Sequence, residues 1–182
     1  IEEGVKMSGC LIAENNTPNC IVRVWLDALF LNNTVSGNRV DPAGQALAVL
    51  HGNPDLVNSI FYGNNATTIH VTGGSNPLIL CCNIEGGKGS IFAYHPNYKG
   101  EFAGIYESNI NCPPAFLDAE NHNYELGPHS PCIDKGTSEN WNTHLTSDIL
   151  GLPRNADNTG RRVDIGAYEY QGDPLNRAPY IQ

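Results

Sequence analysis

The sequence predicts an all-β fold: a right-handed parallel β-helix of about five coils, followed by an irregular C-terminal cap. Three observations predict it. A short pattern of polar, aliphatic and small residues returns about every 25 residues, and side chains within each repeat alternate as in a strand. The 19 Gly and 12 Pro, together with abundant Asn, indicate a chain that turns often and disfavour long helices.

One aliphatic residue anchors each repeat. The anchors follow one another at steps of 24, 25, 24 and 26 residues, and they are Leu11, Val35, Ile60, Ile84 and Ile110. The leucine-rich frame and the helix formers of helical repeats are missing, so a coil of three short strands and three turns fits best. Because side chains alternate between the faces of a strand, each anchor and the residues two positions away are expected to face inward.

This register predicts where polar residues and turns lie. Asn33 and Asn58 are expected to stack inside consecutive coils, with each amide bonded to the next along the axis. The stretch 87–106 departs from the repeat and is predicted to be a long turn or loop.

The six cysteines have no metal-binding spacing, so disulfides and buried thiols both remain open. Leu78 and Leu80 continue the inward register to Cys82. Cys81 is therefore expected to point outward, and a disulfide between Cys81 and Cys82 is not expected.

Charge and hydropathy limit the partners and the location. The net charge is −9 and the ten Lys and Arg are scattered, which disfavours nucleic acid. No stretch approaches the roughly 20 apolar residues of a membrane span. Sequons at Asn15, Asn32 and Asn65 are glycosylation candidates and suit a secreted or cell-surface protein. Ile1 lies less than half a coil before the first anchor, so the chain is expected to be a fragment.

Beyond residue 112 the repeat stops, and short apolar blocks alternate with turn formers. Three of these blocks read SPCIDKG at 130–136, D-x-x-G-x-PR at 148–154 and DIGAYEY at 164–170. In this order they resemble the C-terminal region of bacterial right-handed parallel β-helix repeat proteins of the choice-of-anchor Q type. The resemblance covers the chain to about Tyr170. It implies a pectate-lyase-like superfamily fold, frequent in polysaccharide-active or adhesive proteins, and no particular substrate.

The chain is thus divided into coils at 1–112, a C-terminal cap of the same domain at 113–170, and a linker or tail at 171–182. The cap is expected to close one end of the helix with short strands and loops. Its charged residues are predicted to be structural, with Arg154 paired to Asp164 or Glu169. A two-carboxylate glycosidase site or a calcium site is the alternative for this set, which comprises Asp134, Asp148, Arg154, Asp164 and Glu169.

An enzyme on this fold would be a polysaccharide lyase or a glycoside hydrolase. A lyase needs carboxylates that hold calcium and a nearby base, but no acidic cluster recurs at the coil period. A hydrolase needs two or three acids on adjacent coils, for which Glu14, Asp41 and Glu85 are the candidates. No cofactor and no metal site is predicted, and calcium has only the general acidity in its favour.

A glycan-binding surface has more support, because aromatic rings stack on sugars. Tyr94, Tyr98 and Tyr106 in the irregular stretch are the best candidates, and Trp25 and Phe92 are among the other rings. The leading prediction is a non-catalytic scaffold or glycan-binding module that ends a larger secreted or cell-surface bacterial protein. Its partners would be polysaccharide or neighbouring domains. The alternatives are the C-terminal part of a lyase or hydrolase with its active site upstream, and a structural subunit that stacks end to end.

Overall fold

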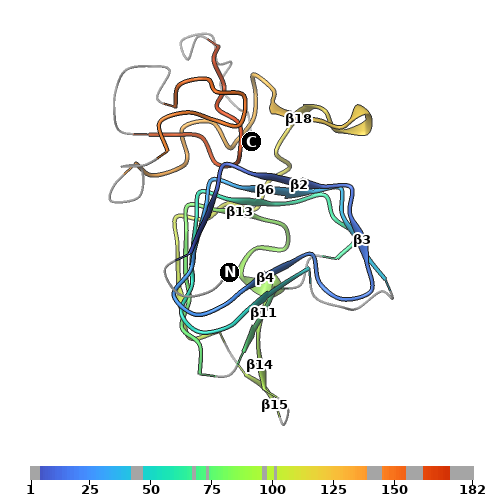
Figure 1. Ribbon diagram of the computed structural model, residues 1–182, viewed down its shortest axis with the longest axis vertical. Coiled ribbons are helices and arrows are strands. Elements are labelled where there is room, and N and C mark those ends of the chain that lie inside the picture. Colours follow the sequence, from blue (N-terminus) through green and yellow to red (C-terminus); the bar gives the residue numbers. More distant parts are fainter. Residues whose placement is uncertain are drawn as a thin grey trace.

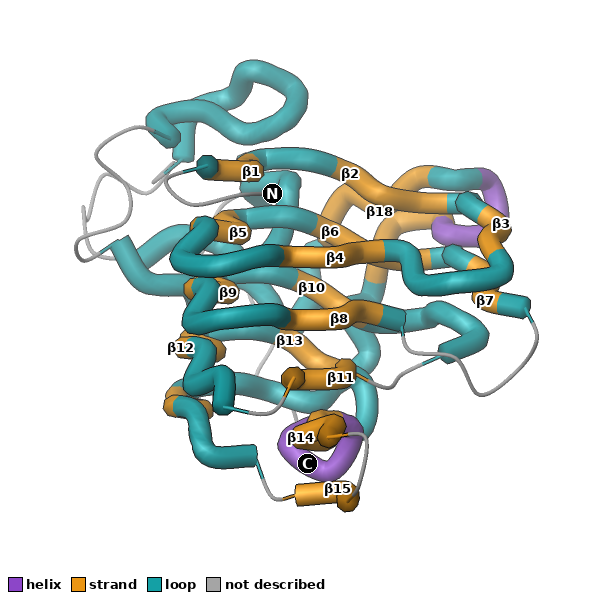
Figure 2. The backbone as a smooth tube through the Cα atoms, turned by 60° about the horizontal axis from the view of Figure 1, so that its bottom comes forward, coloured by secondary structure: helices purple, strands orange, loops and turns teal. Residues whose placement is uncertain are grey.

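The computed structural model describes residues 5–41, 47–66, 69–72, 74–95, 98–100, 102–138, 145–154 and 162–172, with the side chains of 94–100 left out. Within these ranges the chain is all-β apart from two 3-10 turns, and its parallel strands stack as a solenoid of about four turns (Figures 1 and 2). The predicted parallel β-helix is confirmed, with about four turns in place of five coils. In the described ranges, no helix is long and apolar enough to cross a membrane.

Three faces of the solenoid are sheets. The first sheet has the strand order β1 (Lys6–Ser8), β5 (Leu29–Leu31), β9 (Asp55–Val57), β12 (Leu78–Leu80) and β16 (Ile105–Glu107). The second sheet has the order β2 (Leu11–Ala13), β6 (Thr34–Ser36), β10 (Ile60–Phe61) and β13 (Asn83–Ile84). The third sheet has the order β4 (Val22–Val24), β8 (Ala48–Leu50), β11 (Ile69–Thr72), β14 (Ile91–His95) and β15 (Tyr98–Gly100). A fourth side is the pair β3 (Asn16–Thr17) and β7 (Arg39–Val40).

Each sheet turns apolar side chains into one shared core. In the first sheet the middle residue of every strand faces inward, and these residues are Met7, Phe30, Leu56, Ile79 and Tyr106. The inward column of the second sheet is Ile12, Val35, Phe61 and Ile84. The third sheet contributes the first and third positions of its strands, such as Val22 and Val24. Each fully buried side chain of this kind stabilises the fold by about 1.5–3 kcal/mol.

The predicted register of the second sheet is wrong at three of the five anchors. The aligned inward residues return at steps of 23, 26 and 23. Leu11, Ile60 and Ile110 lie instead in the neighbouring outward column, in register with Thr34 and Asn83. Because the turns alternate in length, a nearly constant period selects an outward residue in every second turn, and a slip of one residue reverses the face.

The chain passes from the first sheet to the second through one left-handed residue in each turn. These residues, here called the corner column, have φ between 50° and 63° and are Gly9, Asn32, Asn58, Cys81 and Ser108. A left-handed residue interrupts the alternation of a strand. Leu78 and Leu80 therefore do not continue the inward register, and Ile79 is buried in their place. Cys82 lies in the core and Cys81 faces away from it, as predicted, and both are free thiols.

Asparagines stack along the axis, but the predicted stack of Asn33 on Asn58 is wrong. Asn58 belongs to the corner column, where its Nδ2 donates to Oδ1 of Asn32 at 3.3 Å. Asn33 lies one position later, and its Oδ1 accepts a backbone N–H of the preceding turn at 2.9 Å. A longer stack, with Nδ2 to Oδ1 distances of 2.9 and 3.0 Å, runs through Asn15, Asn38 and Asn64.

The stretch 87–106 is not a long loop, which corrects the prediction. It begins with the 3-10 turn η1 (Gly87–Ser90), continues as β14 and β15, and ends in β16. Strand β14 pairs in parallel with β11 and then antiparallel with β15, so the last turn of the third sheet ends in a hairpin. Figure 2 shows η1 and this hairpin at the end of the solenoid opposite to β1.

The cap does not close an end of the solenoid, which also corrects the prediction. Its hairpin of β17 (Phe116–Asp118) and β18 (Asn123–Leu126), with η2 (Ala119–Asn121) between them, and the irregular chain that follows lie along the outer face of the second sheet (Figure 1). There Ile60 and Ile165 form a second apolar cluster with Leu126, Cys132 and Ile133. Gly166 has a φ of 108°, and a Cβ there would lie 2.7 Å from Ile60 Cδ1, so glycine permits this close approach.

Candidate functional site

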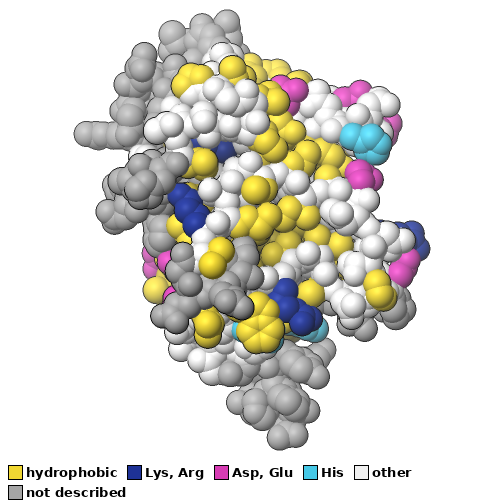
Figure 3. Space-filling view, viewed as in Figure 1, with side chains coloured by type: hydrophobic (Ala, Val, Ile, Leu, Met, Phe, Trp, Pro, Cys, Tyr) yellow, Lys and Arg dark blue, Asp and Glu magenta, His cyan; other side chains and the backbone are white. Residues whose placement is uncertain are grey.

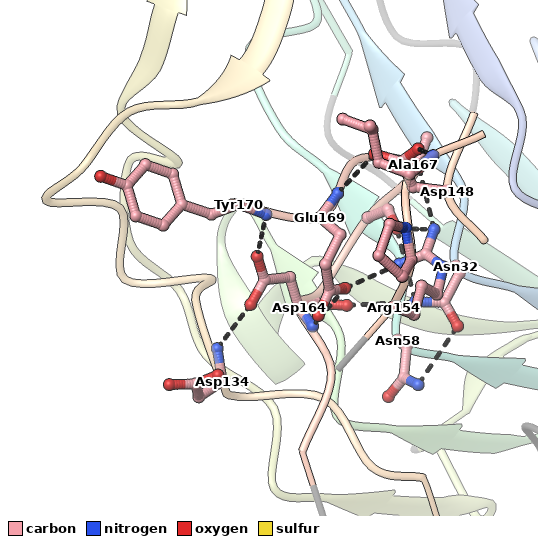
Figure 4. Close-up of polar contacts among 12 residues, drawn as sticks. Asn32, Asn58, Asp134, Asp148, Arg154, Asp164, Ala167, Glu169 and Tyr170 are labelled. Atoms are coloured by element: carbon pink, nitrogen blue, oxygen red, sulfur yellow. Dashed lines mark hydrogen bonds and ion pairs between the residues drawn. The ribbon is translucent and has the colours of Figure 1, made fainter. Parts of the chain in front are cut away.

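A buried charged cluster holds the cap together (Figure 4). Nη1 of Arg154 lies 3.2 Å from Oε2 of Glu169, and both side chains are nearly inaccessible, at 0% and 4% exposed. Nη2 of Arg154 donates to the carbonyl oxygens of Gly166 and Ala167 at 3.1 and 2.8 Å. Among the described residues, Nε of Arg154 has no hydrogen-bond partner. The guanidinium thus forms an ion pair with Glu169 and also binds the backbone of the last cap segment.

Two aspartates of the cluster hold turns through backbone N–H groups. Asp148 accepts from Leu150 and Leu152 through Oδ1, both at 2.9 Å, and from Glu169 through Oδ2 at 3.1 Å. Asp164 accepts from Asp134 at 2.8 Å and from Tyr170 at 2.6 Å. These bonds give both aspartates a structural role in the cap, as the sequence predicted.

Corner-column asparagines fasten the cap to the solenoid. Nδ2 of Asn32 donates to the carbonyl oxygen of Asp164 at 3.1 Å. Nδ2 of Asn58 donates to the carbonyl of Thr137 at 2.8 Å, and its Oδ1 accepts the N–H of the same residue at 2.8 Å. Thr34 adds a bond, since its Oγ1 accepts from the N–H of Ala167 at 3.0 Å. The second sheet is therefore a docking face for its own C-terminal region.

The three sequons differ in accessibility. Asn32 is fully buried and its amide nitrogen is engaged with the cap, so it is not a glycosylation site in the folded chain, which corrects that prediction. Asn15 and Asn65 are exposed. Their amide nitrogens donate to Asn38 and to the carbonyl of Val40, respectively.

The cluster also predicts how stability depends on pH. Burial, and then the charge of Glu169, raise the pKa of Asp164 to about 7, while the N–H groups of Tyr170 and Asp134 act in the opposite direction. In the unfolded chain this carboxyl releases its proton at about pH 4. Between these values the folded state holds a proton that the unfolded state lacks, so the contribution of Asp164 to stability falls as the pH rises from about 4 to about 7.

We expect the free energy of unfolding of Asp164→Asn to lose this dependence, because the amide does not titrate. Urea unfolding of both proteins at several values between about pH 5 and pH 8 measures the difference in slope. The difference isolates Asp164 from Asp55, whose pKa is raised by burial and by Asp27. Parallel pH profiles for the two proteins would contradict the expectation.

The three acids predicted for a hydrolase do not converge. Glu14 accepts from the hydroxyl of Tyr124 and lies 3.4 Å from Nδ1 of His122. Asp41 pairs with Arg39 at 2.6 Å, and Glu85 accepts the N–H of Gly63 at 2.9 Å. No group of three or more potential metal ligands occurs among the described residues. Each acid is thus engaged in a separate structural contact.

The tyrosines predicted to bind glycan are placed differently from one another. Tyr106 continues the inward column of the first sheet and packs against the core, so it is not the exposed stacking ring that was predicted. Burial raises the pKa of its hydroxyl. Tyr94 and Tyr98 lie in β14 and β15, and their side chains are outside the described part of the structure.

A different set of rings occupies the outer face of the third sheet. The outward column of this sheet is Arg23, Val49, His70 and Phe92. The Trp25 ring stacks on the His51 ring of the next turn, with centroids 3.8 Å apart and planes 6° apart. Trp25 is 42% exposed and Phe92 is 36% exposed. Alternation from Val22 and Val24 already indicates that Arg23 and Trp25 point outward.

The electrostatics of this face suit a polar ligand. Burial, and then the charge of Arg23, lower the pKa of His51, which therefore stays neutral at physiological pH. Its Nε2 is buried and has no hydrogen-bond partner among the described residues. This nitrogen is therefore not open to a ligand at the surface, whereas the exposed Arg23 offers a cation beside the rings. The stacked pair and Arg23 thus combine a flat aromatic surface with a positive charge.

The comparisons with known proteins yield no relative: no family model, no curated protein and no solved structure matches the chain. The resemblance of the C-terminal blocks to choice-of-anchor Q proteins is therefore not supported by a family match. The parallel solenoid is established by the structure itself.

Proposed function

We propose that this chain is a non-catalytic β-solenoid scaffold that binds a glycan across the outer face of its third sheet. The exposed, stacked pair of Trp25 and His51 is the observation that carries the proposal. Sugar rings bind aromatic faces through C–H contacts, with polar groups at the rim for hydrogen bonds. The second sheet is covered by the cap, whereas the third sheet keeps its rings at the surface.

The regular stacking of the solenoid supports an extended ligand. Equivalent residues of successive turns lie about 4.8 Å apart along the axis. Arg23, His51 and Phe92 belong to three different turns of this face. A chain of several sugars lying along the axis would therefore contact successive turns. The resemblance to choice-of-anchor Q proteins supports a secreted or cell-surface module within a larger protein.

The other two functions have less support. A lyase or hydrolase would need converging acids, and Glu14, Asp41 and Glu85 each have separate partners. End-to-end stacking would use the first turn, where Met7, Ile12 and Ile21 are only half-buried. Figure 3 shows hydrophobic side chains gathered at the middle of this end of the solenoid. The opposite end finishes in the β14–β15 hairpin and η1, which does not offer three parallel edges for a second copy.

The test is retention on a panel of neutral and acidic polysaccharides, followed by titration of any glycan that binds. We expect at least one glycan to bind and Trp25→Ala to weaken its binding about tenfold, the effect of losing one stacked ring. Leu117→Ala is the matched control, because it removes an exposed apolar side chain from the cap, at 54% exposed.

Binding unchanged by Trp25→Ala, or no retention on any polysaccharide, would overturn the proposal. Assaying the same mixtures for new reducing ends and for unsaturated products separates binding from catalysis. Turnover above a heat-treated control would favour the lyase or hydrolase.

A further inference from the structure

A cleft opens where the last turns of the corner column meet the cap. At two earlier turns, asparagine amides of the column bond directly to the cap backbone, as Asn58 does with Thr137. At the next two turns the column carries the shorter side chains of Cys81 and Ser108. A cavity of about 390 Å³ lies here, with Cys81 and Ser108 on one side and cap residues 134–137 with Arg162 on the other. The small residues leave the space that an asparagine would bridge.

This cleft concentrates positive charge in an acidic protein. The chain has a net charge of −9 with only ten Lys and Arg, yet two of these, Lys135 and Arg162, line the cavity. Both are exposed, and neither forms an ion pair with another described residue. Asp134 also lines the cleft, so its three charged lining residues, Asp134, Lys135 and Arg162, together carry one net positive charge. Burial raises the pKa of the Cys81 thiol, and the positive charge of Arg162 acts in the opposite direction.

We propose that the cleft is an anion-binding site in which Arg162 and Lys135 bind a carboxylate, sulfate or phosphate group of a small ligand. The planar guanidinium of arginine can donate two parallel hydrogen bonds to an oxyanion. The ammonium of lysine adds a positive charge on a flexible side chain. The cavity falls within the range of about 300–1,000 Å³ that is typical of small-molecule sites. An acidic chain repels anions in general, so a local pair of cations is what an anionic ligand requires.

Cys81 provides a reporter within the cleft. Its side chain is 7% exposed and lines the cavity, so a bound ligand would restrict access to its sulfur. The experiment measures the rate of Cys81 alkylation by iodoacetamide, by peptide mass mapping, with glucuronate, sulfate or phosphate present. We expect at least one of these anions to slow Cys81 alkylation several-fold in a saturable manner. The half-buried Cys20, which lies outside the cleft, is the internal control, and glucose is the neutral ligand control.

Variants of the two cations complete the test. Arg162→Gln and Lys135→Gln are each expected to weaken the protecting anion about tenfold, and the double variant to abolish protection. Lys88→Gln removes an exposed cation elsewhere and should leave protection unchanged. The proposal is overturned if none of the anions slows Cys81 alkylation, or if protection survives in the double variant. The anion that protects best distinguishes a uronate-like carboxylate from a sulfate or phosphate ester.

Discussion

Arg154→Met is expected to lower the free energy of unfolding by about 3–5 kcal/mol, the cost of removing one partner from a buried ion pair. The substitution fills similar space but leaves Glu169 without its cation. It also removes one donor from each of the carbonyl oxygens of Gly166 and Ala167, which keep only the bonds from Asn32 Nδ2 at 3.4 Å and from the N–H of Ile149 at 3.1 Å. Asp148 and Asp164 lie in the same buried cluster, so their negative charges also lose compensation. Urea unfolding near neutral pH measures the loss.

Arg39→Met is the matched control, because Arg39 also pairs with a carboxylate but at the surface, with Asp41 at 2.6 Å. Water and salt screen that pair, so little change in stability is expected. The defect of Arg154→Met should shrink at lower pH, where protonation neutralises the buried carboxylates. Equal effects of the two substitutions would show that the buried cluster does not hold the cap together.

The sequence predicts the solenoid because its repeat is a local property. A short aliphatic pattern recurs in each turn, and turn formers separate the strands. The lengths of individual turns are decided by local loops, so the period alone does not define the register. Val35 and Ile84 face inward as predicted, whereas Ile60, one residue from the inward Phe61, does not. The error is one residue in each case, which is enough to reverse a side chain.

The cap illustrates what a sequence pattern leaves open. The residues of the charged cluster occur in three blocks between 134 and 169, which suggested that they act together. The partners of the cap in the solenoid, Asn32 and Asn58, lie more than 70 residues earlier, and nothing in the local pattern connects them to the cap. Ile60 and Thr34 lie in the outward column on which the cap docks, and they can be assigned to that face only when the register is known.

The candidate glycan-binding face could not be predicted from the sequence for a related reason. Trp25 and His51 are 26 residues apart in sequence, close to one turn, so the register of β4 and β8 is needed to bring the rings together. The tyrosines of the irregular stretch were favoured because loops often carry function. In the structure that stretch is largely strand, and Tyr106 is turned into the core. Alternation along Val22 to Trp25 was the available signal.

Phe61→Ala tests the register directly, and it is expected to lower the free energy of unfolding by about 3–5 kcal/mol, as large-to-small changes of buried aromatic rings do. Phe61 is 1% exposed in the inward column of the second sheet, and its ring lies 5.6 Å from that of Phe30. Truncation would leave a cavity in the middle of the core that the neighbouring turns cannot fill, because their backbones are fixed by sheet hydrogen bonds.

Phe92→Ala is the comparison, since it makes the same chemical change on the outer face of the third sheet, where the ring is 36% exposed. We expect it to cost less than about 1 kcal/mol. Thermal and urea unfolding of both variants would give the two values. In the register predicted from a constant period, Tyr62 would face inward and Phe61 outward. A small effect of Phe61→Ala combined with a large effect of Tyr62→Ala would therefore restore that register and move the core of the second sheet by one residue.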